Sequence, residues 1–373
     1  MSKLRLGVIF GSRSVEHEVS IITGCQLVKN ADREKYEIIP LYVDKTGKWW
    51  TKNSLQLSDF SHQNFEDPKG FERFEFSVQP GKNDIDLAII CCHGTLGEDG
   101  TVQGLLELAN IPYQGPGVVG SAVGMDKIIT KKVLEASDIP VVNFQWFTKG
   151  IWEKYGEKAV ISELLDPKQT GHKLLKFPLF VKPANLGSSV GISKAKNEKE
   201  LVEAIKVALS FDSRVLVEQG VERMKEINVS VLGYEDYEAS VPEEPLSSGE
   251  ILSYADKYER GGSKKSSGMA SLSRRIPAPI PQSFAKKLQD AAINAAVMCD
   301  ISGVIRVDFI TKPETGEFWI NELNTIPGSM SFYLWEASGV PYPQLIDRLV
   351  EIALKRQADK KGRISSIQTS IIK

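Results

Sequence analysis

The sequence has few cysteines, and their positions do not suggest a disulfide framework or a zinc site. Only four occur in 373 residues, namely Cys25, Cys91, Cys92 and Cys299. Three lie in apolar surroundings, and the neighbours Cys91 and Cys92 would point to opposite faces of a strand. We interpret all four as reduced thiols, which is typical of a cytoplasmic protein.

Long apolar runs and a strong net charge are also missing. No apolar stretch approaches the ~20 residues that a membrane-spanning helix needs, and the first residues lack the apolar segment of a signal peptide. The 46 basic and 48 acidic residues leave a net charge of −2, which gives no bulk attraction to nucleic acid or to a membrane surface. We therefore expect a cytoplasmic protein that binds neither nucleic acid nor membrane.

The dinucleotide-binding signature is absent, although the chain begins as such domains do. The apolar run 4–10, the loop 11–14 and the helical pattern after it predict a Rossmann-like strand–loop–helix unit. The loop lacks the G-x-G-x-x-G pattern, which argues against NAD. With 42% hydrophobic and 25% charged residues, we expect a globular α/β protein with α+β elements and two or three domains.

The most informative stretch is a predicted β-hairpin at 303–324, where two β-rich runs flank a turn containing proline and glycine. Residues two apart share one face of a strand, so Arg306 and Asp308 would face the same way, as would Glu322 and Asn324. The hairpin can thus gather three oxygen ligands beside one guanidinium. Carboxylate and amide oxygens suit Mg²⁺, while cross-strand charge pairing on a solvated sheet face is the alternative.

A lysine beside a loop of small residues is the second candidate. The apolar strand predicted at 179–183 carries Lys182 and leads into Ala-Asn-Leu-Gly-Ser-Ser-Val-Gly at 184–191. This is not a Walker A loop, which has Gly-Lys-Ser/Thr before a helix. Many N–H groups beside a lysine can still close over phosphates, whereas an ordinary polar turn would not require Lys182.

Two further candidates lie where ligands bind in open α/β sheets, beyond the carboxyl ends of strands. Glu16 lies near the start of the first helix, and His93 opens the glycine-rich stretch 93–100. We interpret Glu16 as an anion for a substrate ammonium, with a helix-dipole contribution as the alternative. His93 is interpreted as a substrate contact or as a residue that orients Glu16, with a structural histidine as the alternative.

Two segments are harder to interpret. Residues 44–80 are polar and aromatic with weak periodicity, and no elements are predicted there. The segment 243–276 is rich in Pro, Ser and Gly and contains Lys257 and Tyr258. A loop of that length within a compact domain is a functional lid or a disordered segment.

Taken in order, these motifs resemble those of the ATP-grasp superfamily. They are a strand lysine with G-S-S-V-G, a short strand ending in Glu, R-x-D, and N-E-x-N-T-x-P-G. The stretches E-H-E-V-S, H-G-x-x-G-E-D-G and Lys257-Tyr258 narrow the resemblance to the D-alanine–D-alanine ligase family. The match covers roughly residues 4–355. Each motif alone is weak to moderate, but their order makes the set specific.

The resemblance implies an ATP-grasp fold: a Rossmann-like N-terminal domain at 1–124, a central lid subdomain at 125–223 and a C-terminal catalytic subdomain at 224–373, with ATP between the last two. It implies an ATP-dependent ligase that makes D-alanyl-D-alanine for peptidoglycan synthesis, and hence for cell-wall formation and cell shape. One D-alanine carboxylate would take the γ-phosphoryl of ATP, and the amine of the second D-alanine would attack the acyl phosphate. Two Mg²⁺ ions, with Mn²⁺ as an alternative, and a homodimer are family expectations.

The resemblance also implies a set of site residues. Family positions with catalytic roles match Glu16, Ser188, Tyr258, Arg306 and the backbone of Gly328. ATP-binding positions match Lys127, Lys182, Ser189, Glu218, Glu226 and Lys257, with Glu226 at the ribose and Glu218 near the adenine. Metal positions match Asp308, Glu322 and Asn324. The expected substrate contacts are Glu16, His93 and Ser331. These types suit phosphoryl transfer, which needs positive charge, and a tetrahedral oxyanion, which needs preorganised donors.

One region departs from the family pattern. After Gly328 the chain reaches Gly339 in fewer residues than better-known members, and Ser331 is the best match to a serine that holds the second substrate's carboxylate. D-serine and D-lactate therefore remain alternative acceptors. A non-catalytic bilobal ligand-binding module is a further alternative. It would explain the N-terminal unit and His93, but not Lys182 together with the acidic hairpin.

Overall fold

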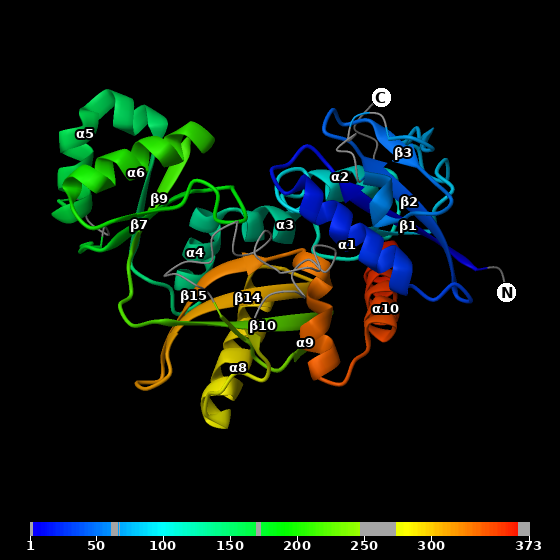
Figure 1. Ribbon diagram of the computed structural model, residues 1–373. Helices are drawn as coiled ribbons and strands as arrows, with labels where there is room; N and C mark the ends of the chain where they lie inside the picture. Colours follow the sequence, from blue (N-terminus) through cyan, green and yellow to red (C-terminus); the bar gives the residue numbers. More distant parts are fainter. Residues whose placement is uncertain (1–2, 61–65, 67, 169–172, 247–273, 365–373) are drawn as a thin grey trace, which may run out of the picture.

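The chain folds into three lobes, each built around its own sheet (Figure 1). The computed structural model describes residues 3–60, 66, 68–168, 173–246 and 274–364. None of the helices in these ranges combines the length and apolar character needed to cross a membrane. The predicted mixture of α and β elements is confirmed.

The N-terminal lobe contains the predicted Rossmann-like unit. Its sheet has the strand order β4-β3-β2-β1-β5, formed by β1 (Leu4–Gly11), β2 (Tyr36–Val43), β3 (Trp49–Thr51), β4 (Glu72–Arg73) and β5 (Leu87–Ile90). Strand β1 pairs in parallel with β2 and β5. It is buried over most of its length, which explains its continuous apolar run. Helices α1 (His17–Asn30) and α2 (Thr101–Leu108) follow β1 and β5.

The stretch with weak periodicity supplies the edge of this sheet. Strands β3 and β4 have three and two residues, and η1 (Leu57–Phe60) is a single 3₁₀ turn. Elements this short cannot develop the alternation by which strands are recognised in a sequence. The stretch is held instead by aromatic packing, in which Phe60 and Phe71 contact Tyr42 of β2.

The central lobe is an antiparallel sheet covered by two helices. Its order is β6-β9-β7-β8, formed by β6 (Phe144–Thr148), β7 (Leu179–Pro183), β8 (Ser193–Ala195) and β9 (Arg214–Gln219). Helices α5 (Lys149–Leu165) and α6 (Glu198–Phe211) lie on its outer side (Figure 1). The amphipathic spacing of α6 predicts its buried face, which includes Leu201 and Ile205. The predicted strand with Lys182 is β7.

The C-terminal lobe contains the predicted hairpin. Its sheet has the order β11-β10-β14-β15, formed by β10 (Lys225–Tyr234), β11 (Asp236–Ala239), β14 (Gly303–Lys312) and β15 (Glu317–Asn324). Helix α8 (Gln282–Met298) packs against β10 and β11. A two-stranded sheet joins β12 (Glu244–Pro245) to β13 (Arg274–Arg275).

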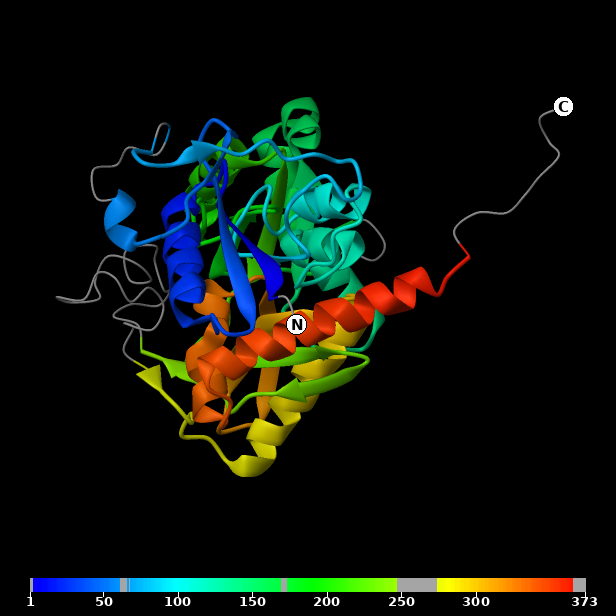
Figure 2. The ribbon, with the colours of Figure 1, turned by 90° about the vertical axis from the view of Figure 1, so that its right-hand side faces the viewer.

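Five further elements connect the lobes. Helices α3 (Val118–Met125) and α4 (Lys127–Ala136) lead from the N-terminal lobe into the centre, and Leu134 of α4 packs into the core of the C-terminal sheet. After β15 come η3 (Gly328–Ser331), α9 (Phe332–Ala337) and α10 (Tyr342–Lys361). Helix α10 returns to the N-terminal lobe (Figure 2). Its residues Leu345 and Leu349 join the core of that lobe. Helix α10 thus connects the C-terminal lobe to the N-terminal lobe.

Candidate active site

The hairpin brings its four predicted residues together. The register pairs Arg306 with Asn324 and Asp308 with Glu322. The Arg306 guanidinium donates to both carboxylate oxygens of Asp308, from Nε at 2.6 Å and from Nη2 at 2.7 Å. Asn324 Nδ2 donates to Asp308 Oδ2 at 3.0 Å. The β-bulge between Asp308 and Phe309 lies beside this cluster, as bulges near functional sites do when they re-aim a side chain.

A buried carboxylate between two lysines connects the central lobe to α4. Glu218 on β9 lies 2.7 Å from Lys131 Nζ and 2.5 Å from Lys182 Nζ, and Lys182 also donates to Asn321 Oδ1 at 2.9 Å. Burial alone would raise the pKa of Glu218, but the two lysines outweigh it and lower that pKa to about 2. Glu218 therefore stays ionised and fixes both ammonium groups.

Lys131 was not among the predicted site residues. It is almost fully buried, and burial lowers its pKa even though Glu218 opposes the shift. One feature of the sequence could have identified Lys131. It follows Lys127 by four residues, so the two lysines share one face of a helix. Lys127 itself donates to the carbonyl of Leu186 at 2.7 Å and lies 3.7 Å from Glu322 Oε2. It thus joins the loop after β7 to the hairpin.

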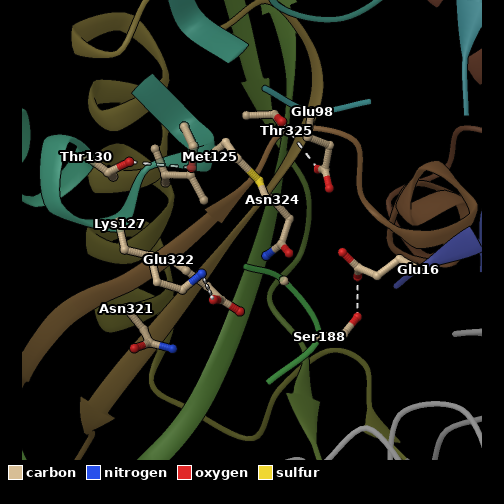
Figure 3. Close-up of a pocket in the computed structure, with 13 residues that line it drawn as sticks. Glu16, Glu98, Met125, Lys127, Thr130, Ser188, Asn321, Glu322, Asn324 and Thr325 are labelled. Atoms are coloured by element: carbon tan, nitrogen blue, oxygen red, sulfur yellow. Dashed lines mark hydrogen bonds and ion pairs between the residues drawn. The ribbon is translucent and has the colours of Figure 1, made fainter. Parts of the chain in front are cut away.

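Glu16 lies between two glycine-rich loops that belong to different lobes. Its carboxylate accepts a hydrogen bond from the Ser188 hydroxyl (Figure 3). A Cβ added at Gly187 would lie 2.3 Å from Glu16 Oε2, and one added at Gly94 would lie 2.6 Å from it. Only glycine allows the two backbones to approach the carboxylate this closely.

A second carboxylate, Glu98, lies close enough to Glu16 for their charges to interact. It accepts hydrogen bonds from the N–H groups of Gly94 and Ile326, each at 2.8 Å, and from the Thr325 hydroxyl at 3.3 Å. Burial, followed by the nearby charge of Glu16, raises the pKa of Glu98 to about 8. In the sequence, Glu98 belongs to the H-G-x-x-G-E-D-G stretch, which predicts no role for this residue.

One pocket collects side chains from all three lobes. The charged or polar side chains that line it are Glu16, Glu98, Lys127, Thr130, Ser188, Asn321, Glu322, Asn324 and Thr325 (Figure 3). In Figure 3, Glu16 and Ser188 point toward each other on one side, and Lys127 lies beside Glu322 on the other. The pocket therefore combines a buried carboxylate, a loop of small residues, a lysine, and carboxylate and amide oxygens of the kind that bind metal ions.

Other predicted residues lie around this pocket. His93 is buried with its ring against the Thr23 hydroxyl, 2.8 Å away, and burial lowers its pKa to about 4. Gly328 begins η3, and Ser331 ends it with a fully buried hydroxyl that has no hydrogen-bond partner among the described residues. His93 and Ser331 are not among the residues that line the pocket.

The remaining predicted residues are Ser189, Glu226 and Lys257, expected at the nucleotide, and Tyr258, expected to be catalytic. Ser189 follows Ser188 in the loop, and both have left-handed backbones. Glu226 on β10 lines a second pocket together with Phe180 of β7. Lys257 and Tyr258 lie outside the described residues.

A lysine-bearing sheet and an acidic hairpin sheet that meet at one pocket, beside a loop of glycine and serine, define an ATP-grasp enzyme. Solved structures agree with this class. The D-alanine–D-alanine ligase from Coxiella burnetii has a TM-score of 0.78 and 31% identity and covers 97% of each chain. The VanG D-Ala:D-Ser ligase from Enterococcus faecalis has a TM-score of 0.79 and 29% identity, covering 94% of this chain and all of that one (100%).

Sequence comparison makes the assignment more specific. Residues 5–116 match the family model described as D-ala D-ala ligase N-terminus, and residues 133–351 match D-ala D-ala ligase C-terminus. The D-alanine–D-alanine ligase of Thermosipho melanesiensis is 38% identical over 380 residues, covering 99% of this chain and 98% of the relative. That of Natranaerobius thermophilus is 38% identical and covers 96% and 97%. The chain belongs to the D-alanine–D-alanine ligase family.

Proposed function

We propose that this protein is an ATP-dependent ligase that joins two molecules of D-alanine into D-alanyl-D-alanine for peptidoglycan synthesis. The observation that carries the proposal is the pocket in which Glu16, Ser188, Lys127 and the hairpin oxygens meet. The proposal includes a cytoplasmic location, a homodimer, and domains at 1–124, 125–223 and 224–373. Within this division, α4 and α10 also pack outside their own domains.

Glu16 binds the ammonium group of the first D-alanine. Its carboxylate is buried, and its hydrogen bond to Ser188 leaves it in contact with the central lobe. An ion pair in a water-poor pocket is stronger than one at the surface, because the local dielectric is low. Binding therefore orients the substrate carboxylate relative to the phosphates and selects against acids that lack the ammonium group.

Lys127 and Lys182 bind the phosphates of ATP. Both are held in place before any ligand binds, Lys127 by the carbonyl of Leu186 and Lys182 by Glu218. Preorganised charges stabilise phosphoryl transfer without reorganisation during the reaction. Glu218, the acid proposed to lie near the adenine, also maintains the lysine geometry together with Lys131. The second pocket, with Phe180 and Glu226, receives the adenosine portion, and Ser189 and Lys257 belong to the proposed ATP contacts.

The hairpin oxygens fit Mg²⁺. Asp308 and Glu322 face each other in the register, and Asn324 adds an amide oxygen. In the described ranges no three His, Cys, Asp or Glu side chains form a metal cluster, and Mg²⁺ is commonly held by one or two carboxylates plus substrate phosphates. When bound, the metal supplies charge neutralisation across the transferring phosphates. One or two such ions, with Mn²⁺ as a substitute, are part of the proposal.

In the second step the amine of the second D-alanine attacks the carbonyl carbon of the acyl phosphate, and the tetrahedral intermediate then breaks its C–O bond to phosphate and releases phosphate. Arg306, fixed by Asp308, and the N–H of Gly328 stabilise the oxyanion of the tetrahedral intermediate. Ser188 or Tyr258 takes the amine proton. Ser331 holds the carboxylate of the second substrate, and His93 supports the site through its contact with Thr23.

The test uses the purified full chain with ATP, Mg²⁺ and D-alanine. ADP release is followed by a coupled assay and the product by mass spectrometry, with L-alanine as the control substrate. D-alanine should stimulate ADP release and yield D-alanyl-D-alanine. The absence of stimulation would overturn the ligase proposal. In competition with D-serine or D-lactate, a mixed product that dominates would overturn the choice of acceptor.

A further inference from the structure

The loop that follows Gly328 has an unusual backbone. Ser329, Met330 and Ser331 all have positive φ angles, of 52°, 56° and 49°. Left-handed backbone is disfavoured for residues other than glycine, so three such residues in succession persist only where surrounding contacts determine them. The loop carries the Gly328 N–H and the buried Ser331 hydroxyl, and its conformation therefore decides where both point.

Thr23 of α1 provides one of these contacts. Its hydroxyl oxygen accepts the N–H of Ser329 at 3.1 Å and lies 2.8 Å from Nε2 of His93. Thr23 and His93 thus share a hydrogen bond whose direction follows the tautomer of His93. Burial lowers the pKa of His93, so its ring is neutral. Its ring also hydrogen-bonds the backbone of Ile326.

The N-terminal lobe thus holds the loop on both sides of Gly328. Thr23 holds Ser329 on one side, while His93 and Glu98 hold Ile326 on the other, the latter by accepting its N–H at 2.8 Å. Thr23 and His93 are almost fully buried, and Glu98 lines the pocket.

Helix α1 connects the contact between Thr23 and the loop to the proposed subsite for the first substrate. Glu16 is the N-cap of α1, and Thr23 lies two turns further along the same helix. One rigid element therefore carries the carboxylate for the first ammonium and the contact that sets the loop. Any displacement of α1 would move both together.

We propose that Thr23 is a positioning residue for the second substrate: through Ser329 it fixes the Gly328 N–H and the Ser331 hydroxyl at a set distance from Glu16. This inference rests on the proposed ligase function. It assigns the E-H-E-V-S helix a second task beyond presenting Glu16, and it gives His93 a role through Thr23.

The test compares Thr23→Val with Thr23→Ser. Valine keeps the shape of threonine but leaves the Ser329 N–H and His93 Nε2 without their partner, whereas serine retains the hydroxyl. The matched control is Ser240→Ala, which removes a buried hydroxyl that also accepts a backbone N–H, from Ser230 at 2.9 Å, and does not line the pocket. Steady-state rates are measured against ATP and D-alanine, whose saturation curve separates the two D-alanine subsites.

Thr23→Val should lower kcat/KM for the second D-alanine by ~10–100-fold, the order expected for a misplaced catalytic group. KM for ATP and for the first D-alanine should stay within about threefold of the wild-type values. Thr23→Ser should behave as wild type. Ser240→Ala should leave the ratio of kcat/KM values for the two D-alanine subsites unchanged. Equal losses at both subsites, no loss, or no rescue by serine would overturn the proposal.

If Thr23→Val does not fold, Thr23→Cys, which keeps the volume and a weak donor, must show the same selective loss. A uniform loss in that variant would equally overturn the proposal. Wild-type protein run in parallel separates the two inferences. Wild-type protein that releases no ADP in response to D-alanine refutes the ligase function itself. An active wild type with a kinetically normal Thr23→Val refutes only the positioning role.

Discussion

The Ser188 hydroxyl donates a hydrogen bond to the Glu16 carboxylate, although the two residues lie 172 positions apart and belong to different lobes. Ser188 has a left-handed backbone, and its neighbour Gly187 leaves no room for a side chain beside Glu16. The central lobe therefore contacts the N-terminal lobe at the group assigned to the first substrate's ammonium. The proposed roles of Glu16 and of this loop would therefore couple substrate binding to the position of the loop through one carboxylate.

Ser188→Ala should impair use of D-alanine with little effect on ATP binding. A hydrogen bond to a charged group contributes ~1.5–3 kcal/mol, which corresponds to a ~10–100-fold fall in kcat/KM for D-alanine. Initial rates against D-alanine and ATP check this. Ser210→Ala is the control, because Ser210 is an exposed serine of the same lobe that donates to Val207. Equal kinetics in the two variants would refute a substrate role for Ser188.

The hairpin was predictable because its signal is local. Residues two apart on adjacent strands share a face, and this alone predicts that Arg306, Asp308, Glu322 and Asn324 meet. The roles of Thr23 and Glu98 were not predictable, since each depends on contacts with a loop more than two hundred residues away in the chain. Periodicity within a segment carries no information about which segment lies opposite.

The same limit applies to the fold. Helix α10 is amphipathic and its presence is predicted by its pattern, but nothing in the pattern indicates that it packs on the N-terminal lobe. Helix α5 was not predicted at all, and its two halves meet at Gly156 with a non-helical backbone, which interrupts the period on which recognition of a helix depends.

Lys182→Met should lower kcat by ~10²–10³-fold, as removal of an electrostatic stabiliser does. The structure adds a stability cost that the sequence did not indicate. Glu218 is buried and loses one of its two lysines. Leaving a buried charge wholly unpaired costs ~3–5 kcal/mol, and the cost here should be smaller because Lys131 remains.

Single-turnover rates and urea unfolding measure the two effects of Lys182→Met separately. Lys206→Met is the control, since Lys206 is a half-exposed lysine of the same lobe that pairs with Glu157, and it should change neither quantity appreciably. A folded Lys182→Met protein with near-normal kcat would remove this lysine from the mechanism.

Glu322→Gln should raise the Mg²⁺ concentration that supports half-maximal activity by ~10-fold or more, because a carboxylate ligand is replaced by a weaker neutral oxygen. Glu317→Gln tests the same substitution on the same strand at an exposed position and should behave as wild type. Binding of Mg²⁺–ATP, followed by calorimetry, gives a measurement independent of turnover. An unchanged Mg²⁺ requirement in Glu322→Gln would contradict the metal assignment.

Glu98 should make stability depend on pH in a direction opposite to that of an ordinary paired carboxylate. Burial and the charge of Glu16 raise its pKa to about 8, above the value of 4.5 for the unperturbed group. Between these two values the folded protein keeps a proton that the unfolded chain releases. The contribution of Glu98 to the free energy of unfolding therefore falls as pH rises through this window.

Glu98→Gln removes this titration. The difference in unfolding free energy between wild type and Glu98→Gln, measured with urea at pH 5, 6, 7 and 8, should become less favourable to wild type as pH increases. Glu16→Gln provides a check of the cause, because removing the neighbouring charge should lower the pKa of Glu98 and confine the decline to lower pH. A difference that does not vary with pH would mean that Glu98 ionises as it does in the unfolded chain, and that its hydrogen bonds to Gly94 and Ile326 outweigh burial.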